Sequence, residues 1–144
     1  MKINIIAVGT LGKEWKTLYK DYFKKLGFYA HVRLSEVKPV NDRNIEVVKQ
    51  KETMIIQSLI PKNSRVVLCS LKGKQYSSEE FSAKFTETDN ITFVVGGSYG
   101  VDESQFSEKL NFSPMTFPHQ MFRVMLVEQL FRAFSIKSGS KYHK

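Results

Sequence analysis

Three short segments of the chain combine glycine, serine and apolar residues in a way that suits the binding of a small ligand. They are residues 70–74, 96–100 and 112–118, and each follows a run of apolar residues typical of a buried strand. In a parallel sheet, ligands bind beyond the carboxyl ends of the strands, and glycine lets the backbone approach a ligand closely. The three segments therefore predict one ligand site, unless the glycines only shape a tight turn.

Residues 96–100 also match G-x-S-x-G, the nucleophile elbow of serine hydrolases, with Ser98 as the nucleophile. Asp102 and either His119 or His143 follow in the order that a catalytic triad requires. An elbow serine, however, leads directly into a long helix, whereas only a short helical stretch is predicted after Ser98. The chain is also short for a hydrolase sheet, so a serine hydrolase is the less favoured alternative.

The chain offers little for other kinds of chemistry. It contains neither G-x-x-x-x-G-K-[ST] nor G-x-G-x-x-G, the motifs that bind nucleotide phosphates. Cys69 is the only cysteine, which excludes an intramolecular disulfide and a thiolate metal cluster. His31, His119 and His143 are scattered along the sequence and lack the spacing of zinc ligands. We therefore expect no metal ion at the site.

The elements that must position these segments alternate along the chain. Short apolar runs predict strands, and apolar residues at three- and four-residue steps predict helices. Ser77 with Glu80 forms a candidate capping box, and Asp102 can cap a short helix. The expected order is strand 3–8, helix 11–26, strand 30–34, helix 45–60, strand 65–71, a helix after Ser77, strand 91–95, a short helix after Asp102, strand 110–112 and helix 118–136.

This alternation predicts an α/β fold, in which a mostly parallel sheet carries helices on both faces. No interdomain linker or repeat interrupts the pattern, so residues 1–144 are expected to form a single domain. The first two helices each show an apolar face that should contact the sheet. The residues of these faces are Leu11, Trp15, Leu18, Tyr22 and Leu26 in the first helix, and Ile45, Val48, Ile55, Ile56 and Leu59 in the second.

The last helix, residues 118–136, is apolar around nearly its whole circumference. Such a helix must be buried on all sides, and a domain of this size has little room for that, so we expect a homodimer. Arg123, Glu128 and Arg132 then lie in apolar surroundings, where a charge is costly unless it is paired or functional. Glu128 and Arg132 stand four residues apart and can simply pair with each other.

Charge narrows the class of partner. The chain has 22 Lys and Arg against 14 Asp and Glu, a formal net charge of +8, which favours a polyanion such as nucleic acid. A merely basic surface is the alternative. The apolar run at the N-terminus is short and is broken by Asn4, so neither a signal peptide nor a membrane-spanning helix is expected. These features predict a cytoplasmic protein with no membrane partner.

Five segments resemble the ribosomal large subunit methyltransferase H family, and the similarity runs from residue 7 to the last residue. The segments are 71–74, 93–100, 112–120, 123–133 and 142–144, of which Met-Thr-Phe-Pro-His-Gln is the most specific part. The resemblance implies a SPOUT-class fold whose C-terminal segment forms a trefoil knot, an exception to the rule that chains avoid knots. It further implies a homodimer that methylates N3 of a pseudouridine in 23S ribosomal RNA with S-adenosyl-L-methionine.

The resemblance also implies where the cofactor binds. The residues concerned are Cys69, Gly96, Phe112, Ser113, Pro114, Met115, Thr116 and Phe117. Backbone groups of segment 112–117 can read the edges of adenine while side chains enclose its faces. The sequence departs from the family where relatives commonly have leucine and an acidic residue, because Cys69 and Ser70 stand there instead. The missing carboxylate can weaken a cofactor contact, and Pro114 should stiffen the loop.

Methyl transfer needs in-line positioning and loss of the N3 proton of the imide, which a modest base or a nearby cation can assist. The candidates for catalysis are His143, Tyr142, Arg132 and Glu128, and those for RNA binding are Arg123, Lys141 and Lys144. The sequence does not choose a base among them, and it leaves open which subunit's tail completes each site. It also does not say whether the substrate is free RNA, the large subunit or the assembled ribosome. A non-enzymatic basic dimer that binds RNA or ribosomes is the competing class.

Overall fold

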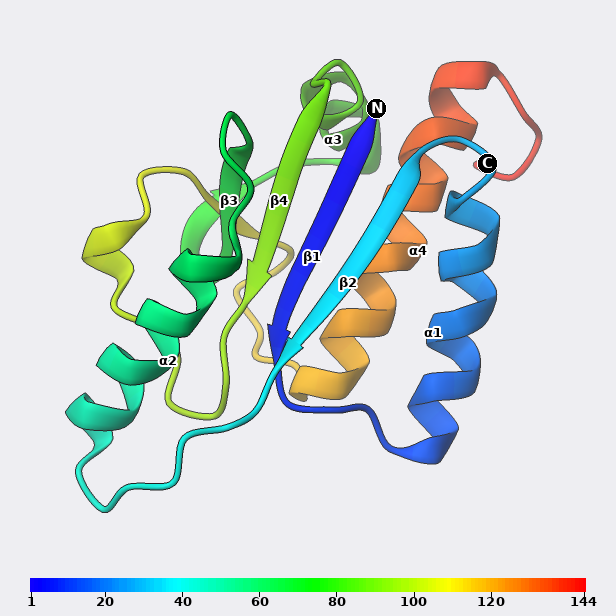
Figure 1. Ribbon diagram of the computed structural model, residues 1–144. Helices are drawn as coiled ribbons and strands as arrows, with labels where there is room; N and C mark the ends of the chain where they lie inside the picture. The colour runs from blue at the N-terminus through cyan, green and yellow to red at the C-terminus, as the bar shows by residue number, and fades with distance from the viewer.

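The computed structural model describes residues 1–144 and contains one five-stranded sheet (Figure 1). Its strands lie in the order β2-β1-β4-β3-β5, and every neighbouring pair is parallel. This arrangement confirms the predicted α/β class. The strands are β1 (Lys2–Val8), β2 (His31–Val37), β3 (Arg65–Gln75), β4 (Asn90–Val95) and β5 (Lys109–Asn111), and the helices are α1 (Lys13–Leu26), α2 (Ile45–Leu59), α3 (Ser78–Phe85), the 3-10 turn η1 (Glu103–Gln105) and α4 (His119–Ser138).

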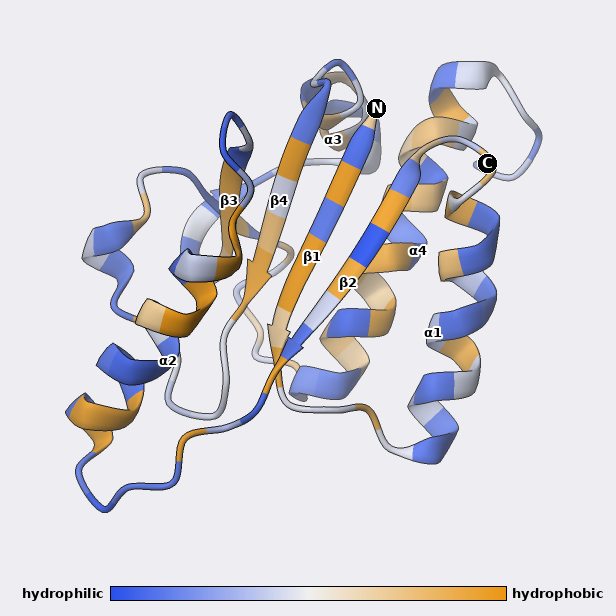
Figure 2. Ribbon diagram, in the orientation of Figure 1, coloured by the Kyte–Doolittle hydropathy of each residue, from blue (hydrophilic) through white to orange (hydrophobic).

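Both faces of the sheet are covered, which is why the central strands β1 and β4 are buried along nearly their whole length and mostly apolar, with Asn4 and Thr92 as buried polar residues (Figure 2). Ile3 and Ile5 of β1 face a large core to which α1, α3 and α4 contribute. Ile6 and Val8 point to the other face, where Ile56 of α2 completes a smaller core. Helices therefore lie on both faces of the sheet, as the alternation of elements predicts.

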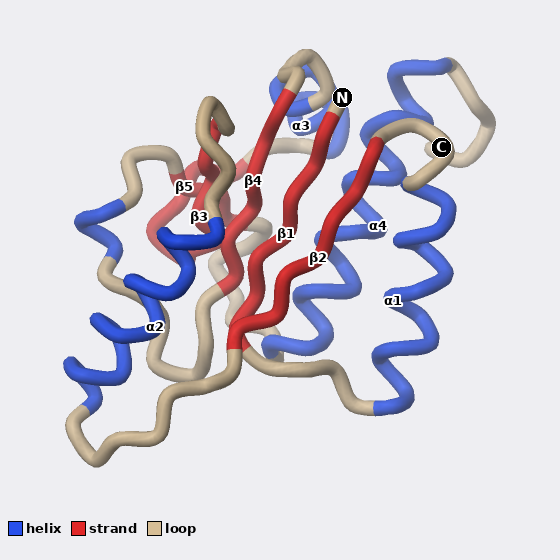
Figure 3. The backbone as a smooth tube through the Cα atoms, viewed as in Figure 1, coloured by secondary structure: helices blue, strands red, loops and turns tan.

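The direction in which the chain moves across the sheet reverses between β1 and β4. From β1 the chain reaches β2 on one side, whereas β4, β3 and β5 lie on the other side. Open parallel sheets bind ligands outside the carboxyl ends of the strands at such a reversal. Figure 3 shows several long loops gathered at this end of the sheet.

The helix signals of the sequence are confirmed in detail. The Ser77 hydroxyl accepts a hydrogen bond from the Glu80 amide at 3.0 Å, and the Glu80 carboxylate accepts one from the Ser77 amide at 2.9 Å. The Asp102 side chain caps η1. Gly139 follows α4 in the left-handed conformation, with φ of 74°, which only glycine adopts without strain.

Most element boundaries differ from the prediction by one or two residues, and those of β2 and β3 differ by more. β2 continues to Val37, and β3 continues to Gln75 because Lys74 and Gln75 pair with β5 beyond an irregularity after Cys69. Polar residues at a sheet edge carry no periodic signal, so the sequence predicted a turn there. Helix α4 begins at His119, with Pro118 as its N-cap, and ends at Ser138.

The predicted inner faces of α1 and α2 are partly wrong. Leu18 is 50% exposed, and Ile45, Ile55 and Leu59 are 49%, 41% and 42% exposed. Helix α2 instead buries a stripe that includes a carboxylate, because Val48, Glu52 and Ile56 follow one another at four-residue steps. Only the packing of α2 against the sheet decides which of its several apolar stripes is covered.

Helix α4 packs against α1 and α3, and it is not buried on every side within one chain. Its apolar residues Met121, Phe122, Met125, Phe131 and Ile136 stay partly exposed. The dimer and the C-terminal knot therefore stay predictions. No helix of the chain combines the length and the apolar character that crossing a membrane requires.

Candidate functional site

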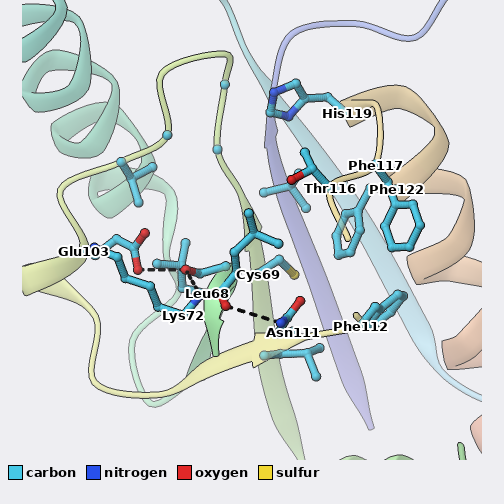
Figure 4. A pocket seen from close by; sticks show the side chains of 18 of the residues that line it. Leu68, Cys69, Lys72, Glu103, Asn111, Phe112, Thr116, Phe117, His119 and Phe122 are labelled. Atoms are coloured by element: carbon cyan, nitrogen blue, oxygen red, sulfur yellow. Dashed lines mark hydrogen bonds between the residues drawn. The ribbon is translucent and has the colours of Figure 1, made fainter. Parts of the chain in front are cut away.

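A cavity of about 420 Å³ opens at the carboxyl ends of β3, β4 and β5 (Figure 4). The end of β3, the glycine turn after β4 and the loop before α4 form its walls. These are the three segments that the sequence predicts to form one ligand site. The lining residues are Leu68, Cys69, Ser70, Leu71, Lys72, Val95, Gly96, Gly97, Ser98, Gly100, Val101, Glu103, Leu110, Asn111, Phe112, Met115, Thr116, Phe117, His119 and Phe122.

The glycine turn is closed by a hydrogen bond from the Gly100 amide to the Gly97 carbonyl at 3.0 Å. A Cβ atom on Gly96 would lie 3.2 Å from the Val101 side chain and 3.3 Å from the Gly100 backbone. Glycine at position 96 therefore lets the turn fold back on itself. Ser98 in this turn is exposed, and a turn rather than a helix follows it, so the geometry of a nucleophile elbow is absent.

The end of β3 crosses very close to β5. A Cβ atom on Gly73 would lie 2.5 Å from the backbone of Leu110, a distance that only glycine avoids. Next to this crossing, the Asn111 amide donates to the Leu71 carbonyl at 3.3 Å, and its oxygen accepts from the Ser113 amide at 3.1 Å. Asn111 thus joins β3 to the loop before α4, a role that no sequence pattern indicated.

The eight residues predicted to hold the cofactor do not all reach the cavity. Ser113 and Pro114 are absent from its lining, and the other six line it. Ser113 shapes the loop instead, because its hydroxyl accepts a hydrogen bond from the Met115 amide at 3.0 Å. Phe112 stacks obliquely on Phe122, with ring centroids 4.9 Å apart, and these rings give one side of the cavity an aromatic wall.

The opposite side of the cavity is polar, as Figure 4 shows. The Ser70 hydroxyl donates to Glu103 at 2.8 Å and accepts from the Lys72 amide at 3.1 Å, while the Lys109 ammonium lies 3.6 Å from the same carboxylate. The resemblance implies an acidic residue at position 70, where this chain has Ser70. Glu103 supplies an acidic group to the cavity instead. Glu103 lies 33 residues from Ser70, which is why the sequence did not reveal this pair.

Cys69 lies in the wall between these two sides. Burial raises the pKa of its thiol to about 12. The thiol is therefore protonated at neutral pH and acts as a small apolar group rather than as a nucleophile.

The four residues predicted for catalysis form one cluster on the outer side of α4. Glu128 Oε1 accepts hydrogen bonds from Tyr142 at 3.0 Å and from Arg132 at 2.6 Å. The two ring nitrogens of His143 lie 3.0 Å from the Arg132 guanidinium and 2.7 Å from the Glu79 carboxylate. Glu79, on the first turn of α3, is a member of this cluster that the sequence analysis missed.

Protonation states in this cluster follow from its contacts. Burial, then hydrogen bonding with Tyr22 and donation to the Glu128 carboxylate, raises the pKa of Tyr142 above its usual value, so its phenol is neutral at physiological pH. The hydrogen bond from His143 lowers the pKa of Glu79, which is therefore ionised. Because a guanidinium can only donate, His143 Nδ1 accepts the hydrogen bond from Arg132, and Nε2–H donates to the Glu79 carboxylate.

This cluster does not reach the cavity of its own chain. None of its members lines the cavity, and the C-terminus lies beside the N-terminus, at the other end of the sheet (Figure 1). Lys141 and Lys144 of the tail are exposed. The structure thus brings the catalytic candidates together with one another but not into this cavity, although Glu128 lines a second cavity of about 440 Å³ together with Phe112 and Phe117.

Arg123, predicted to bind RNA, is 2% exposed and does not present its charge on the surface. Its guanidinium donates to the Gly9 carbonyl at 3.1 Å and to Glu36 at 2.8 Å, and it lies 5.6 Å from the centre of the Tyr19 ring. The pairing with Glu36 joins residues 87 positions apart in sequence. No three His, Cys, Asp or Glu side chains come together as ligands for a metal ion.

Comparison with known proteins identifies the family to which this α/β chain belongs. A family profile described as "Predicted SPOUT methyltransferase" matches residues 1–143. The chain belongs to the SPOUT methyltransferase family, and this membership implies a methyl-donor cofactor.

Its relatives specify the branch of that family. Three of them are named ribosomal RNA large subunit methyltransferase H. The protein of Mycoplasma mobile is 58% identical over 144 residues and that of Mycoplasmopsis pulmonis 54% over 146, and a Clostridium botulinum protein is 42% identical over 159. Each alignment covers 100% of this chain and 100% of the relative.

Proposed function

We propose that this chain transfers a methyl group from S-adenosyl-L-methionine to N3 of a pseudouridine in large-subunit ribosomal RNA. The observation that carries the proposal is the cavity at the carboxyl ends of the strands, with one aromatic wall and one acidic wall. The names of the full-length relatives support ribosomal RNA as the substrate. We place the reaction in the cytoplasm, where ribosomes are assembled.

The residues present fit the proposed cofactor. A cavity of about 420 Å³ lies within the usual range for small-molecule sites. Phe112 and Phe117 offer apolar surface to adenine, and the Glu103 carboxylate can accept hydrogen bonds from ribose hydroxyls, as acidic residues do in other nucleotide sites. The bound cofactor supplies an activated methyl group, so the protein must mainly orient the acceptor and assist loss of its proton.

We further propose that a homodimer completes the site, with the tail cluster of one copy placed at the cavity of the other. The support is that none of Glu79, Glu128, Arg132, Tyr142 and His143, the tail cluster, lines the cofactor cavity of its own chain. The second cavity of about 440 Å³, lined by residues of α1, α3 and α4 and by Phe112 and Phe117 of the loop before α4, offers a surface for such a partner. Partly exposed Met125 and half-exposed Leu18 would be covered there.

In the proposed dimer, the tail cluster orients the RNA and handles the proton of N3. Tyr142 is neutral and can donate a hydrogen bond, and the Arg132 guanidinium can stabilise the anionic imide. His143 must leave Arg132 before Nδ1 can accept a proton. Lys141 and Lys144 supply phosphate contacts, in keeping with the net charge of +8. The single domain and the C-terminal knot belong to the same proposal.

Two measurements test the proposed activity. Calorimetry should detect binding of S-adenosyl-L-methionine, and tritiated methyl groups should appear in ribosomal particles from a strain that lacks the enzyme. Cofactor binding without methyl transfer to free RNA, large subunits or assembled ribosomes would refute the substrate. Absence of cofactor binding would favour a non-enzymatic basic dimer.

A further inference from the structure

A smaller cavity of about 180 Å³ lies next to the proposed cofactor site and has no role so far. It opens between the carboxyl end of β1, the loop after β2, helix α2 and the start of α4. Its walls share Gly97, Ser98 and His119 with the larger cavity. A ligand here would therefore meet the cofactor site across the glycine turn.

One wall carries Glu52, a carboxylate that is only 2% exposed. Its Oε2 atom accepts a hydrogen bond from the Val40 amide at 2.8 Å, whereas Oε1 has no partner. A Cβ atom on Gly97 would lie 3.0 Å from Oε1, so only glycine at position 97 fits beside this buried oxygen. A buried carboxylate oxygen without a partner is costly, which indicates that a donor from outside the chain satisfies it.

Another wall carries Arg123, whose two terminal nitrogens make one hydrogen bond each, to the Gly9 carbonyl and to Glu36. Its Nε atom has no acceptor. The guanidinium cannot lose its charge, so this N–H group is a permanent donor in a fixed position. The cavity thus presents one unpaired acceptor and one unpaired donor, both on nearly inaccessible side chains.

An N–H group next to a carbonyl group complements such a pair, and pyrimidine bases carry this arrangement. In pseudouridine, N1–H adjoins the C2 carbonyl, and N3 adjoins C2 on its other side. In uridine the ring position that corresponds to N1 is a C–H group, because N1 is bonded to the ribose. The N1–H group is therefore the feature that distinguishes the two bases.

We propose that the smaller cavity receives the target base, with Glu52 accepting the N1–H group of pseudouridine and Arg123 Nε–H donating to its C2 carbonyl. A base held by these two atoms has N3 beside the contacts, where it can face the shared wall toward the methyl donor. This assignment rests on the proposed function and adds a specificity residue to it. Sites built around an N–H group reject analogues that lack it, because a buried acceptor is then left unpaired.

Glu52→Gln tests the assignment with minimal change in shape. The Val40 amide must keep an acceptor, so the amide oxygen of the new side chain faces Val40 and its NH2 group faces the base. The group that faces the N1–H group of the base thus changes from a hydrogen-bond acceptor to a donor. Glu46→Gln is the matched control, since it makes the same change at an exposed carboxylate of the same helix.

Methyl transfer is compared on ribosomal particles that carry pseudouridine or uridine at the target. We expect wild type and Glu46→Gln to prefer pseudouridine, and Glu52→Gln to lose at least about tenfold in kcat/KM on pseudouridine but little on uridine. The affinity for S-adenosyl-L-methionine should stay within about twofold in calorimetry. An unchanged preference, or equal losses on both particles, would overturn the assignment and leave an ordered water as the occupant.

A wild-type measurement covers the case in which Glu52→Gln fails to fold. Free pseudouridine at millimolar concentration should shift the Gly97 amide resonance in NMR spectra, whereas N1-methylpseudouridine should not. Equal shifts with both nucleosides, or none, would refute base binding at Glu52. If wild type transfers no methyl group to any ribosomal particle, the proposed function itself fails, which is a separate outcome.

Discussion

Replacement of Glu36 by alanine removes the only carboxylate that faces the buried Arg123 guanidinium. The side chain of Arg123 is 3% exposed and that of Glu36 is 35% exposed, and their atoms lie 2.8 Å apart. After the change, the guanidinium keeps its bond to the Gly9 carbonyl, but its charge has no partner. Arginine cannot neutralise itself by losing a proton, so the folded state bears the whole cost.

The size of the effect follows from burial. Removal of one partner from a fully buried ion pair costs about 3–5 kcal/mol. Because Glu36 is partly exposed, water can enter the vacated space and solvate one side of the guanidinium. We therefore expect a loss of about 2–3 kcal/mol in the free energy of unfolding. For a chain of this size that corresponds to a Tm lower by roughly 6–12 °C.

Urea denaturation at one protein concentration measures this loss. Glu46→Ala is the control, because its pair with Lys49 is 3.7 Å long and 70% exposed on the acidic side and should contribute less than about 1 kcal/mol. Joint replacement of Glu36 and Arg123 by apolar residues should restore part of the stability. A Glu36→Ala variant within about 0.5 kcal/mol of wild type would refute the idea that Arg123 depends on this partner.

Three further outcomes are expected. Gly73→Ala should lower the free energy of unfolding by about 3 kcal/mol or more in urea denaturation, since its Cβ would lie 2.5 Å from the Leu110 backbone; wild-type stability would contradict the tight crossing. Iodoacetamide at pH 8 should alkylate Cys69 at least about a hundredfold more slowly in the native protein than in urea, because the pKa of the native thiol is about 12. The free energy of unfolding should fall above about pH 9, because the thiol of the unfolded chain ionises at a lower pH than the native one. Equal rates would show a thiol open to water. Glu103→Gln should weaken S-adenosyl-L-methionine binding about fivefold or more in calorimetry, while deletion of residues 141–144 should abolish methyl transfer and leave that affinity intact. If the deletion weakened cofactor binding and Glu103→Gln abolished only methyl transfer, the tail would hold the cofactor and Glu103 would act in catalysis.

Local patterns in the sequence were enough for the order of elements and for the family. The apolar strand 91–95, the capping box at Ser77 and the glycine after α4 each depend on neighbours within a few residues. The three segments that line the larger cavity could be found for the same reason, because each directly follows a strand. The residues of segment 112–120 are specific enough to indicate the methyltransferase family without the tertiary structure.

The polar contacts inside and between the cavities could not be found in this way. Ser70 with Glu103 and Arg123 with Glu36 join residues 33 and 87 positions apart. Periodicity indicates that a residue lies on an apolar face, but it did not reveal that Glu52 of α2 is buried, and it does not tell which group lies opposite. That choice belongs to the packing of helices on the sheet, which also places the tail at the end of the molecule away from the cavity.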